Sequence, residues 1–202
     1  MQQTVSKATL GRLPMYLTHL RGAKTQTISA TALSKALGLG DVQVRKDLNA
    51  ASGEGKPKIG YVVADLIDKL ESCIGVDTPT AAVLVGAGKL GRALYAFDGF
   101  AEYGLEIVAA FDSAVTSPQV ERTGKPIYPM SALPSFLQAH PVKIGILTVP
   151  DEAAQAVCDT LVSAHVAAIW SFAPGRIHVP PEVAVRQENL PLSLAHLSKQ
   201  IQ

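Results

Sequence analysis

The sequence has few cysteines, few aromatic residues and almost no net charge. Of 202 residues, 2 are cysteine, 5% are aromatic and the formal net charge is +1. Cys73 and Cys158 form no CxxC motif and have no histidine or aspartate at ligand spacing, so we expect buried core thiols, with a disulfide or a reactive thiol as the alternative, and no metal site. A net charge this small gives no overall support for a nucleic-acid-binding protein.

Long apolar runs are also missing. No stretch approaches 18 uninterrupted apolar residues, so we expect no membrane-spanning helix. The first residues, MQQTVSKATLGRL, contain no apolar run of signal-peptide length, and we therefore expect a cytoplasmic protein. Apolar residues make up 48% of the chain, which suffices for a sizeable core in one large domain or two small ones.

The charges are distributed unevenly along the chain. Residues 1–63 contain nine Lys or Arg and three Asp or Glu, a balance of +6, whereas residues 64–202 contain nine and fourteen, a balance of −5. A basic segment followed by an acidic one indicates two domains with different partners. We predict a DNA-binding domain over 1–76, a dinucleotide-binding domain over 80–188 and a dimerisation helix over 189–202.

The first 76 residues have the pattern of a winged helix. A helical stripe over 4–21 is interrupted by Pro14, which predicts either a kink or a second helix that starts there. Ser29 is expected to cap a helix that ends at the glycines of GLG, and Asp41 to cap the next helix, DVQVRKDLNAAS. Residues 53–63 predict a basic β-hairpin, the wing, and residues 63–75 an amphipathic helix.

Polar and basic side chains gather on this second helix and on the wing. Gln and Asn can pair with adenine and Arg with guanine, whereas Lys more often contacts phosphate. The alternative is a solvated basic face without a ligand, and the adjacent hairpin and the +6 balance favour DNA. The candidate DNA-contacting residues are Ser29, Gln43, Arg45, Lys46, Asn49, Lys56, Lys58 and Tyr61.

From residue 81 onward strands alternate with helices, which favours an α/β fold with a parallel sheet. We predict strands over 105–112, 125–129, 142–150 and 167–174, with a final strand in EVAVRQ. We also predict a helix from 151 capped by Asp151, and a terminal helix with Leu190, Leu194 and Leu197 on one face.

A GxGxxG motif follows the buried strand AAVLV and precedes a helix, which is the context that a dinucleotide site requires. The candidate phosphate-binding residues are Gly86, Ala87, Gly88, Lys89, Leu90 and Gly91. The first glycine allows the tight turn, the second allows a pyrophosphate to approach the backbone, and the third allows the helix to pack closely on the strand. A glycine turn without a ligand is the alternative.

Further candidate cofactor residues lie at the ends of two other strands. Asp112 lies 21 residues beyond Gly91, where a carboxylate can accept hydrogen bonds from the adenosine ribose and would repel a 2′-phosphate, so NAD is favoured over NADP. Thr148, Val149 and Pro150 follow a strand at the same edge of the sheet, unless they are an ordinary strand exit.

The sequence resembles the Rex family of redox-sensing transcriptional repressors over almost its whole length. The resemblance rests on the segments RLPMYL, QVRKDL, IGY, VGAGKLGRAL, GFAEYG, AAFD, ILTVP and SFAP. It implies a homodimer with an N-terminal winged-helix domain, a Rossmann-type domain and a C-terminal helix, Leu190–Ile201, that swaps onto the partner. It also implies binding to a palindromic operator, released by NADH and permitted by NAD⁺.

The resemblance has departures at the positions expected near the nicotinamide. In that family an arginine of the first helices, a tyrosine after the glycine-loop helix and an aspartate before the swapped helix connect one another. The matching positions here hold Thr18, Phe97 and Asn189. Phe97 and Leu190 are further candidate cofactor residues, and the departures make a repressor with a weakened or altered nucleotide response an alternative function. The segment after QVRKDL, Asn-Ala-Ala-Ser-Gly, also differs from the family pattern.

An NAD-dependent dehydrogenase is the alternative from another class. It would need a general acid or base near the nicotinamide, and none of the five histidines lies in a recognisable catalytic setting. The first 75 residues form the basic helical module, which leaves no second catalytic domain of useful size. We therefore predict a sensor with no catalytic residues.

Overall fold

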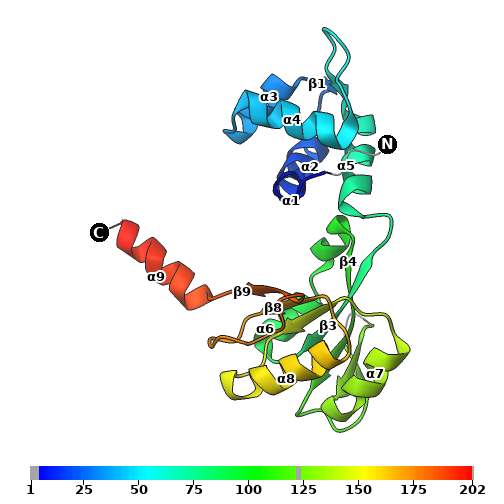
Figure 1. The fold of residues 1–202 in the computed structure, drawn as a ribbon, viewed down its shortest axis with the longest axis vertical. Coiled ribbons are helices and arrows are strands. Elements are labelled where there is room, and N and C mark those ends of the chain that lie inside the picture. The colour runs from blue at the N-terminus through cyan, green and yellow to red at the C-terminus, as the bar shows by residue number, and fades with distance from the viewer. Residues whose placement is uncertain (1–4, 122–123, 202) are drawn as a thin grey trace. The chain divides into compact units, whose positions relative to one another are not determined.

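The computed structural model describes residues 5–121 and 124–201 (Figure 1). The chain forms two compact units. The N-terminal unit comprises residues 1–79 and 101–104, and the C-terminal unit comprises residues 80–100 and 105–202. Residue 4, where the predicted helical stripe begins, and the terminal residue 202 lie outside the described residues.

The N-terminal unit is a helical bundle with a two-stranded antiparallel sheet, β1 pairing with β2. Its elements are α1 (Lys7–Leu10), α2 (Leu13–Arg21), β1 (Thr27–Ile28), α3 (Ala30–Leu37), α4 (Asp41–Ser52), β2 (Tyr61–Val62) and α5 (Val63–Ile74). Side chains from four of these helices form its core, including Leu13, Leu17, Leu33, Val44, Leu48, Leu66 and Leu70. α3, a short turn and α4 form the predicted helix-turn-helix.

Local signals explain the boundaries of these helices, with one correction. Pro14 lies in the first turn of α2, so the stripe splits into two helices. The Ser29 side chain accepts a hydrogen bond from the amide of Ala32 and caps α3, as expected. The expectation for Asp41 was wrong, because Gly40 occupies the cap position and Asp41 lies inside α4, where it forms an ion pair with Arg45 at 2.9 Å.

The wing is shorter than a full hairpin. Its two sides meet at one isolated antiparallel bridge between Lys56 and Gly60, and β2 then pairs with β1 rather than with the other side of the wing. The chain returns directly into α5 at Val63, whose amide donates to the Gln26 carbonyl. β1 is therefore the strand that anchors the base of the wing.

The C-terminal unit is built on a seven-stranded sheet of order β5-β6-β4-β3-β7-β8-β9, parallel except for β5. The strands are β3 (Thr80–Val85), β4 (Leu105–Asp112), β5 (Gln119–Val120), β6 (Pro126–Pro129), β7 (Ile144–Leu147), β8 (Ala168–Ser171) and β9 (Ala184–Gln187). The order reverses between β3 and β7, so the loops after these strands flank the switch point where ligands of such sheets bind.

Helices cover the two faces of this sheet unequally. α7 (Leu133–Ala139) and α8 (Asp151–Ser163) pack on one face (Figure 1), where the core includes Val83, Val85, Leu147 and Leu161. α6 (Lys89–Tyr95) and Phe100, at the start of a 3₁₀ turn over Asp98–Tyr103, cover part of the other face, where Leu84, Tyr95, Ala110 and Ile127 are buried. The rest of that second face carries an apolar groove of about 480 Å³ lined by side chains of β3, β4, β7, β8 and β9.

Two details of this unit differ from the sequence expectation. The helix after the glycine motif was expected over the whole of KLGRALYAFDGFAEYG, residues 89–104, but ends at Tyr95, and β7 covers only Ile144–Leu147 of the strand expected over 142–150. Asp151 does not cap α8, because Pro150 occupies the cap position and the Asp151 carboxylate instead accepts from the amide of Gly175 at 2.6 Å.

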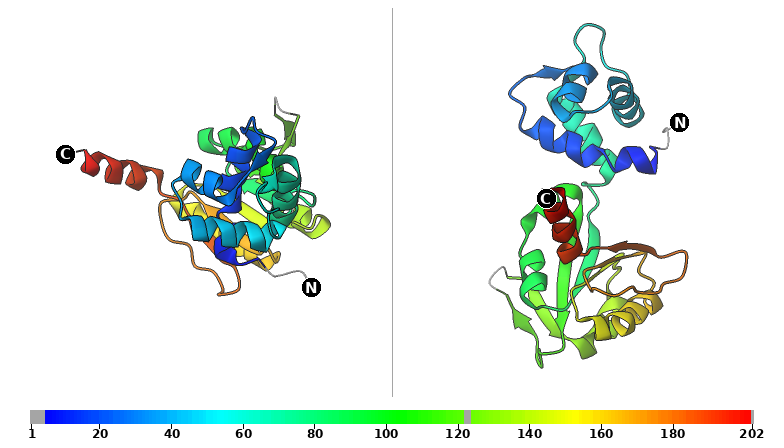
Figure 2. Two further views of the ribbon diagram at one scale, coloured as in Figure 1. Left: turned by 90° about the horizontal axis from the view of Figure 1, so that it is seen from above. Right: turned by 90° about the vertical axis from the view of Figure 1, so that its left-hand side faces the viewer.

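The last helix, α9 (Leu190–Gln200), extends beyond β9 away from the sheet, as Figures 1 and 2 show. None of its residues is buried. Its apolar side chains are about half exposed or more, among them Leu190, Leu192, Leu194 and Leu197. The Asn189 side chain accepts from the amide of Leu192 and caps the helix.

Candidate functional site

The glycine loop after β3 needs glycine for steric reasons at two of its positions. Gly86 has φ of 99°, a conformation that other residues rarely adopt, and a Cβ there would lie 2.6 Å from the Thr148 carbonyl oxygen. A Cβ on Gly91 would overlap the carbonyl oxygen of Gly86. Gly91 therefore allows α6 to begin directly against the end of β3, which is the close packing expected of the motif.

Thr148, directly after β7, links the glycine loop to that strand by a side-chain hydrogen bond across the switch point. Its hydroxyl donates to the carbonyl of Gly86 at 2.6 Å and lies 3.2 Å from the carbonyl of Val85. The sequence predicted that Thr148 lies at the ligand edge of the sheet. It did not predict this hydrogen bond, which forms because β3 and β7 are adjacent strands. Val149 and Pro150 follow it, half-buried and exposed respectively.

Asp112 lies at the end of β4 beside the same loop. Its carboxylate accepts hydrogen bonds from the amides of Ala87 at 2.6 Å and Ala114 at 2.8 Å. The carboxylate that was predicted to bind a ribose is therefore held in position by the loop that was predicted to bind the pyrophosphate. Gly88, Lys89 and Leu90 are exposed at the start of α6, so this part of the loop is open to a ligand.

Three polar residues that were not predicted support this edge. Arg92 donates to the carbonyl of Ala87 at 2.8 Å and forms an ion pair with Glu121. Gln187 donates to the carbonyls of Ala173 and Gly175 and so holds the loop after β8. Arg92 follows the glycine motif directly, so its role could have been predicted from the sequence. Gln187 could not, because it reaches this edge only through the pairing of β9 with β8.

Phe97 and Leu190 are not enclosed within the single chain. Phe97 is 57% exposed and packs edge-to-face on Phe100 with ring centroids 5.2 Å apart. Leu190 is 54% exposed at the start of α9. The glycine loop, Asp112 and Thr148 are therefore assembled by the chain itself, whereas these two predicted cofactor residues are not.

The predicted DNA-contacting side chains of α4 lie on one exposed face of the helix. Gln43, Arg45, Lys46 and Asn49 are all exposed, whereas Val44 and Leu48 are buried. A groove of about 350 Å³ runs between α4 and the wing, lined by Arg45, Lys46, Asn49, Glu54, Gly55 and Tyr61. The two segments thus form one surface, although the Arg45 charge is partly neutralised by Asp41.

The wing exposes both of its lysines. Lys58 has φ of 63°, a left-handed conformation that is uncommon for a residue other than glycine, near the turn of the wing. Lys56 accepts from the amides of Ile59 and Gly60 through its carbonyl, which closes the turn. Both ammonium groups are therefore presented on a compact loop. Ser29 is exposed as well, but its hydroxyl is engaged in capping α3.

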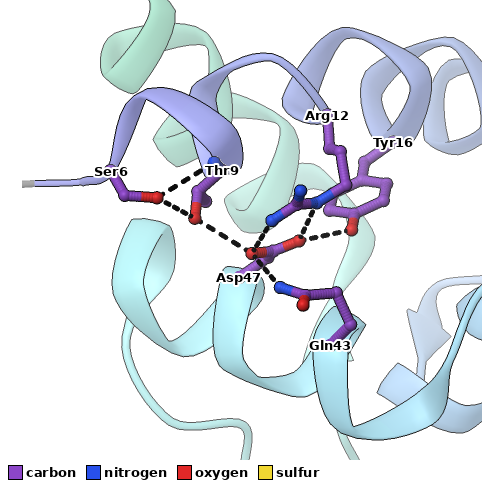
Figure 3. A network of polar contacts seen from close by, with 6 residues as sticks. All are labelled: Ser6, Thr9, Arg12, Tyr16, Gln43 and Asp47. Atoms are coloured by element: carbon purple, nitrogen blue, oxygen red, sulfur yellow. Dashed lines mark hydrogen bonds and ion pairs between the residues drawn. The ribbon is translucent and has the colours of Figure 1, made fainter.

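The most connected polar residue of the N-terminal unit is Asp47, a residue that sequence reasoning missed (Figure 3). It lies on α4 and is 1% exposed. Its carboxylate accepts from Thr9 at 3.0 Å, from Arg12 at 2.7 and 2.8 Å, from Tyr16 at 2.7 Å and from Gln43 at 3.0 Å. The network therefore ties α1 and α2 to the helix that carries the candidate base-reading residues.

The ion pair between Asp47 and Arg12 and the hydrogen bonds around it determine the protonation states in this network. Burial alone would raise the pKa of Asp47, but hydrogen bonds from Arg12, Tyr16, Thr9 and Gln43 outweigh burial and lower the pKa to about 2. Burial and the neighbouring carboxylate raise the pKa of Tyr16 to about 12. Asp47 is therefore ionised, and Tyr16 protonated, at neutral pH.

Residues 101–104, which comprise the last three residues of the 3₁₀ turn and the glycine after it, belong to the N-terminal unit. Arg21 forms ion pairs with Glu71 and Glu102, both at 2.8 Å. The hydroxyl groups of Thr18 and Tyr103 are 3.1 Å apart. Thr18, at the position where the resemblance led us to expect an arginine, thus contacts this segment through a neutral hydrogen bond.

Two absences follow from the described residues. Between residues 5 and 121 and between 124 and 201, no three side chains of His, Cys, Asp or Glu are grouped so that they could hold a metal ion. Over the same ranges, no helix combines the length and apolar character that crossing a membrane requires.

Comparison with known proteins identifies the family. The family model described as "Putative DNA-binding protein N-terminus" matches residues 4–49, and the model described as "CoA binding domain" matches residues 77–175. The redox-sensing transcriptional repressor Rex of Bacteroides fragilis is 38% identical over 96% of this chain and 88% of its own length. That of Treponema denticola is 38% identical over 97% and 95%. The chain belongs to the Rex family.

Solved structures of a Rex-family repressor have the same fold. RSP in complex with β-NAD⁺ and operator DNA superposes with a TM-score of 0.87 at 30% identity, over 98% of this chain and 92% of that chain. RSP in complex with β-NADH gives 0.83 over 98% and 94%. The winged-helix and Rossmann-type architecture predicted from the sequence is confirmed. Rex proteins are transcriptional repressors, so membership decides against the dehydrogenase alternative.

Proposed function

We propose that this Rex-family chain is a transcriptional repressor that binds operator DNA through α4 and the wing and responds to the NADH/NAD⁺ ratio through the glycine loop. The observation that carries the proposal is that one chain joins an exposed basic helix-turn-helix surface to a cradle built by Gly86, Gly91, Asp112 and Thr148. RSP, which matches over both units, was crystallised with operator DNA and with either form of the dinucleotide.

The dinucleotide is assigned to the switch point for two reasons. A pyrophosphate can approach the backbone of this loop at Gly88, which has no side chain and has open space where a Cβ would point. The carboxylate of Asp112 stands where the ribose hydroxyls of the adenosine would donate to it, and its negative charge disfavours a 2′-phosphate. NADH and NAD⁺ are therefore the proposed ligands, with the nicotinamide end directed toward Val149 and Pro150.

A homodimer is part of the proposal because the single chain leaves two apolar surfaces uncovered. The groove on the sheet is lined by Ile107, Ile144, Ile146 and Trp170 among others. The leucines of α9 are exposed. Covering each with a second copy would bury apolar area that water disfavours, and two winged helices would read both halves of a palindromic operator. We propose that α9 is the helix exchanged between the two copies.

The test is release of DNA by the nucleotide. Purified protein is bound to duplexes selected from a random library, and NADH, NAD⁺ and NADPH are titrated against the complex in a mobility-shift assay. Release by NADH at concentrations at which NAD⁺ leaves the complex intact supports the proposal. Failure to bind any duplex, or release by all three nucleotides alike, contradicts it.

A second candidate function is a repressor with a weaker discrimination between NADH and NAD⁺. The observation that favours it is that Thr18, Phe97 and Asn189, the three positions that depart from the family pattern, carry no charge. Thr18 bonds to Tyr103 through a hydroxyl, Phe97 has no hydroxyl, and Asn189 serves as a helix cap. A charged network linking these positions is absent from these side chains. The same titration distinguishes the two candidates by the ratio of NADH and NAD⁺ concentrations needed for half release.

A further inference from the structure

Gln43 is held by Asp47 in a way that determines which end of its amide faces outward. The Gln43 amide nitrogen Nε2 donates to Asp47 Oδ1 at 3.0 Å, one turn along α4. An ionised carboxylate only accepts hydrogen bonds, so it attracts the amide nitrogen and repels the amide oxygen. The orientation of this amide is therefore decided by charge, and Figure 3 shows Oε1 directed away from the carboxylate.

Asp47 is itself immobilised, which makes it a firm anchor for Gln43. Both oxygens are engaged by Arg12, and Thr9 and Tyr16 donate to one oxygen each. The side chain is buried against α1 and α2. Gln43 is exposed on the same face of α4 as Lys46, and no group among the described residues donates a hydrogen bond to its Oε1.

We propose that Gln43 reads a base with an exocyclic amino group in the major groove, because Asp47 presents its amide oxygen outward as a fixed acceptor. This inference rests on the proposed function of α4 as the DNA-reading helix. Adenine N6 and cytosine N4 donate in the major groove, whereas guanine O6 and thymine O4 accept and would oppose Oε1. Adenine also accepts at N7, which the second N–H of Gln43 can reach.

Gln43 is thus a specificity-determining residue and Asp47 a positioning residue. A glutamine that is free to rotate can turn its amide, so that it pairs either with a base that donates a hydrogen bond or with a base that accepts one. Here turning the amide would place Oε1 against the carboxylate of Asp47. The preference at one base pair of each half-site is therefore set by a residue that is buried and does not contact DNA.

The experiment measures base preference rather than affinity alone. The full chain and its Gln43→Met variant each select from a randomised duplex library, and the bound pools are sequenced. We expect wild type to enrich one base pair at one position per half-site, and Gln43→Met to lose that preference by roughly tenfold while other positions keep theirs. Duplexes with purine, which lacks the amino group, or 7-deazaadenine, which lacks N7, in place of adenine then separate the two contacts.

Two further variants test the positioning role. Asp47→Asn offers Gln43 an amide, which can donate as well as accept, so we expect the preference among base pairs at the same position to weaken. The matched control is Gln155→Met on α8, where Gln155 also donates to an aspartate one turn on, Asp159, at 2.7 Å. Its base preferences should equal those of wild type.

The outcomes separate this inference from the proposed function. A wild-type chain that selects no sequence overturns both. Selection by wild type that Gln43→Met leaves unchanged at every position overturns only the role of Gln43. Wild-type binding that is unchanged when the exocyclic amino group of the selected base pair is removed, with purine for adenine or 2-pyrimidinone for cytosine, overturns the outward acceptor, and unaltered discrimination in Asp47→Asn overturns the role of Asp47.

Discussion

Replacing Asp47 by asparagine should destabilise the N-terminal unit at neutral pH and much less in acid. The side chain is nearly isosteric, so the change removes the negative charge rather than the packing. A pKa lowered from its ordinary value near 3.8 to about 2 corresponds to about 2 kcal/mol. Because the partner Arg12 is 28% exposed, water screens part of this interaction, and we expect a loss of between about 1 and 2 kcal/mol.

The pH dependence follows from the direction of the pKa change. The pKa of Asp47 is lower in the folded chain than in the unfolded one, so its contribution is fully present above pH 4 and disappears as the pH falls through about 2. Wild type should therefore be more stable than Asp47→Asn at pH 6, and the two should converge near pH 2.

The assay is urea unfolding of both proteins across this pH range, followed by far-ultraviolet circular dichroism. The single tryptophan, Trp170, lies in the C-terminal unit, and its fluorescence is an internal control that should be the same for both proteins. An equal difference in unfolding free energy at pH 6 and pH 2, or no difference at either, would refute the reasoning.

Three other substitutions have defined expectations. Gly91→Ala places a Cβ over the Gly86 carbonyl, so NADH affinity measured by fluorescence titration should fall roughly tenfold or more, and unchanged affinity would exclude this loop as the cradle. Thr148→Val removes one hydrogen bond to the loop and should lower the stability of the C-terminal unit by about 1 kcal/mol in the urea assay; no loss would show that the bond is not needed. Leu194→Asp charges the apolar stripe of α9, so the dimer dissociation constant from sedimentation should rise at least about tenfold, whereas an equally tight dimer would place the interface elsewhere.

Features that depend on a few neighbouring residues could be predicted from the sequence. Ser29 caps α3, Pro14 divides the first helices and β4 covers 105–112 as expected, because caps, prolines and runs of apolar residues act within a few residues. The glycine spacing identified the phosphate loop for the same reason. Asp41 and Asp151 were misplaced because a carboxylate just before a helical run fits either the cap or the first turn, and the structure decided between them.

The tertiary structure alone decided which distant residues meet. Nothing near Asp47 in the chain shows that Arg12 and Tyr16, more than 30 residues earlier, would surround its carboxylate and leave Gln43 with its oxygen outward. The bond from Thr148 to the glycine loop likewise exists only because β7 pairs with β3. Helices and turns are determined by neighbours in sequence, whereas a buried charge network depends on how helices pack, and packing sums many weak contacts that no single segment encodes.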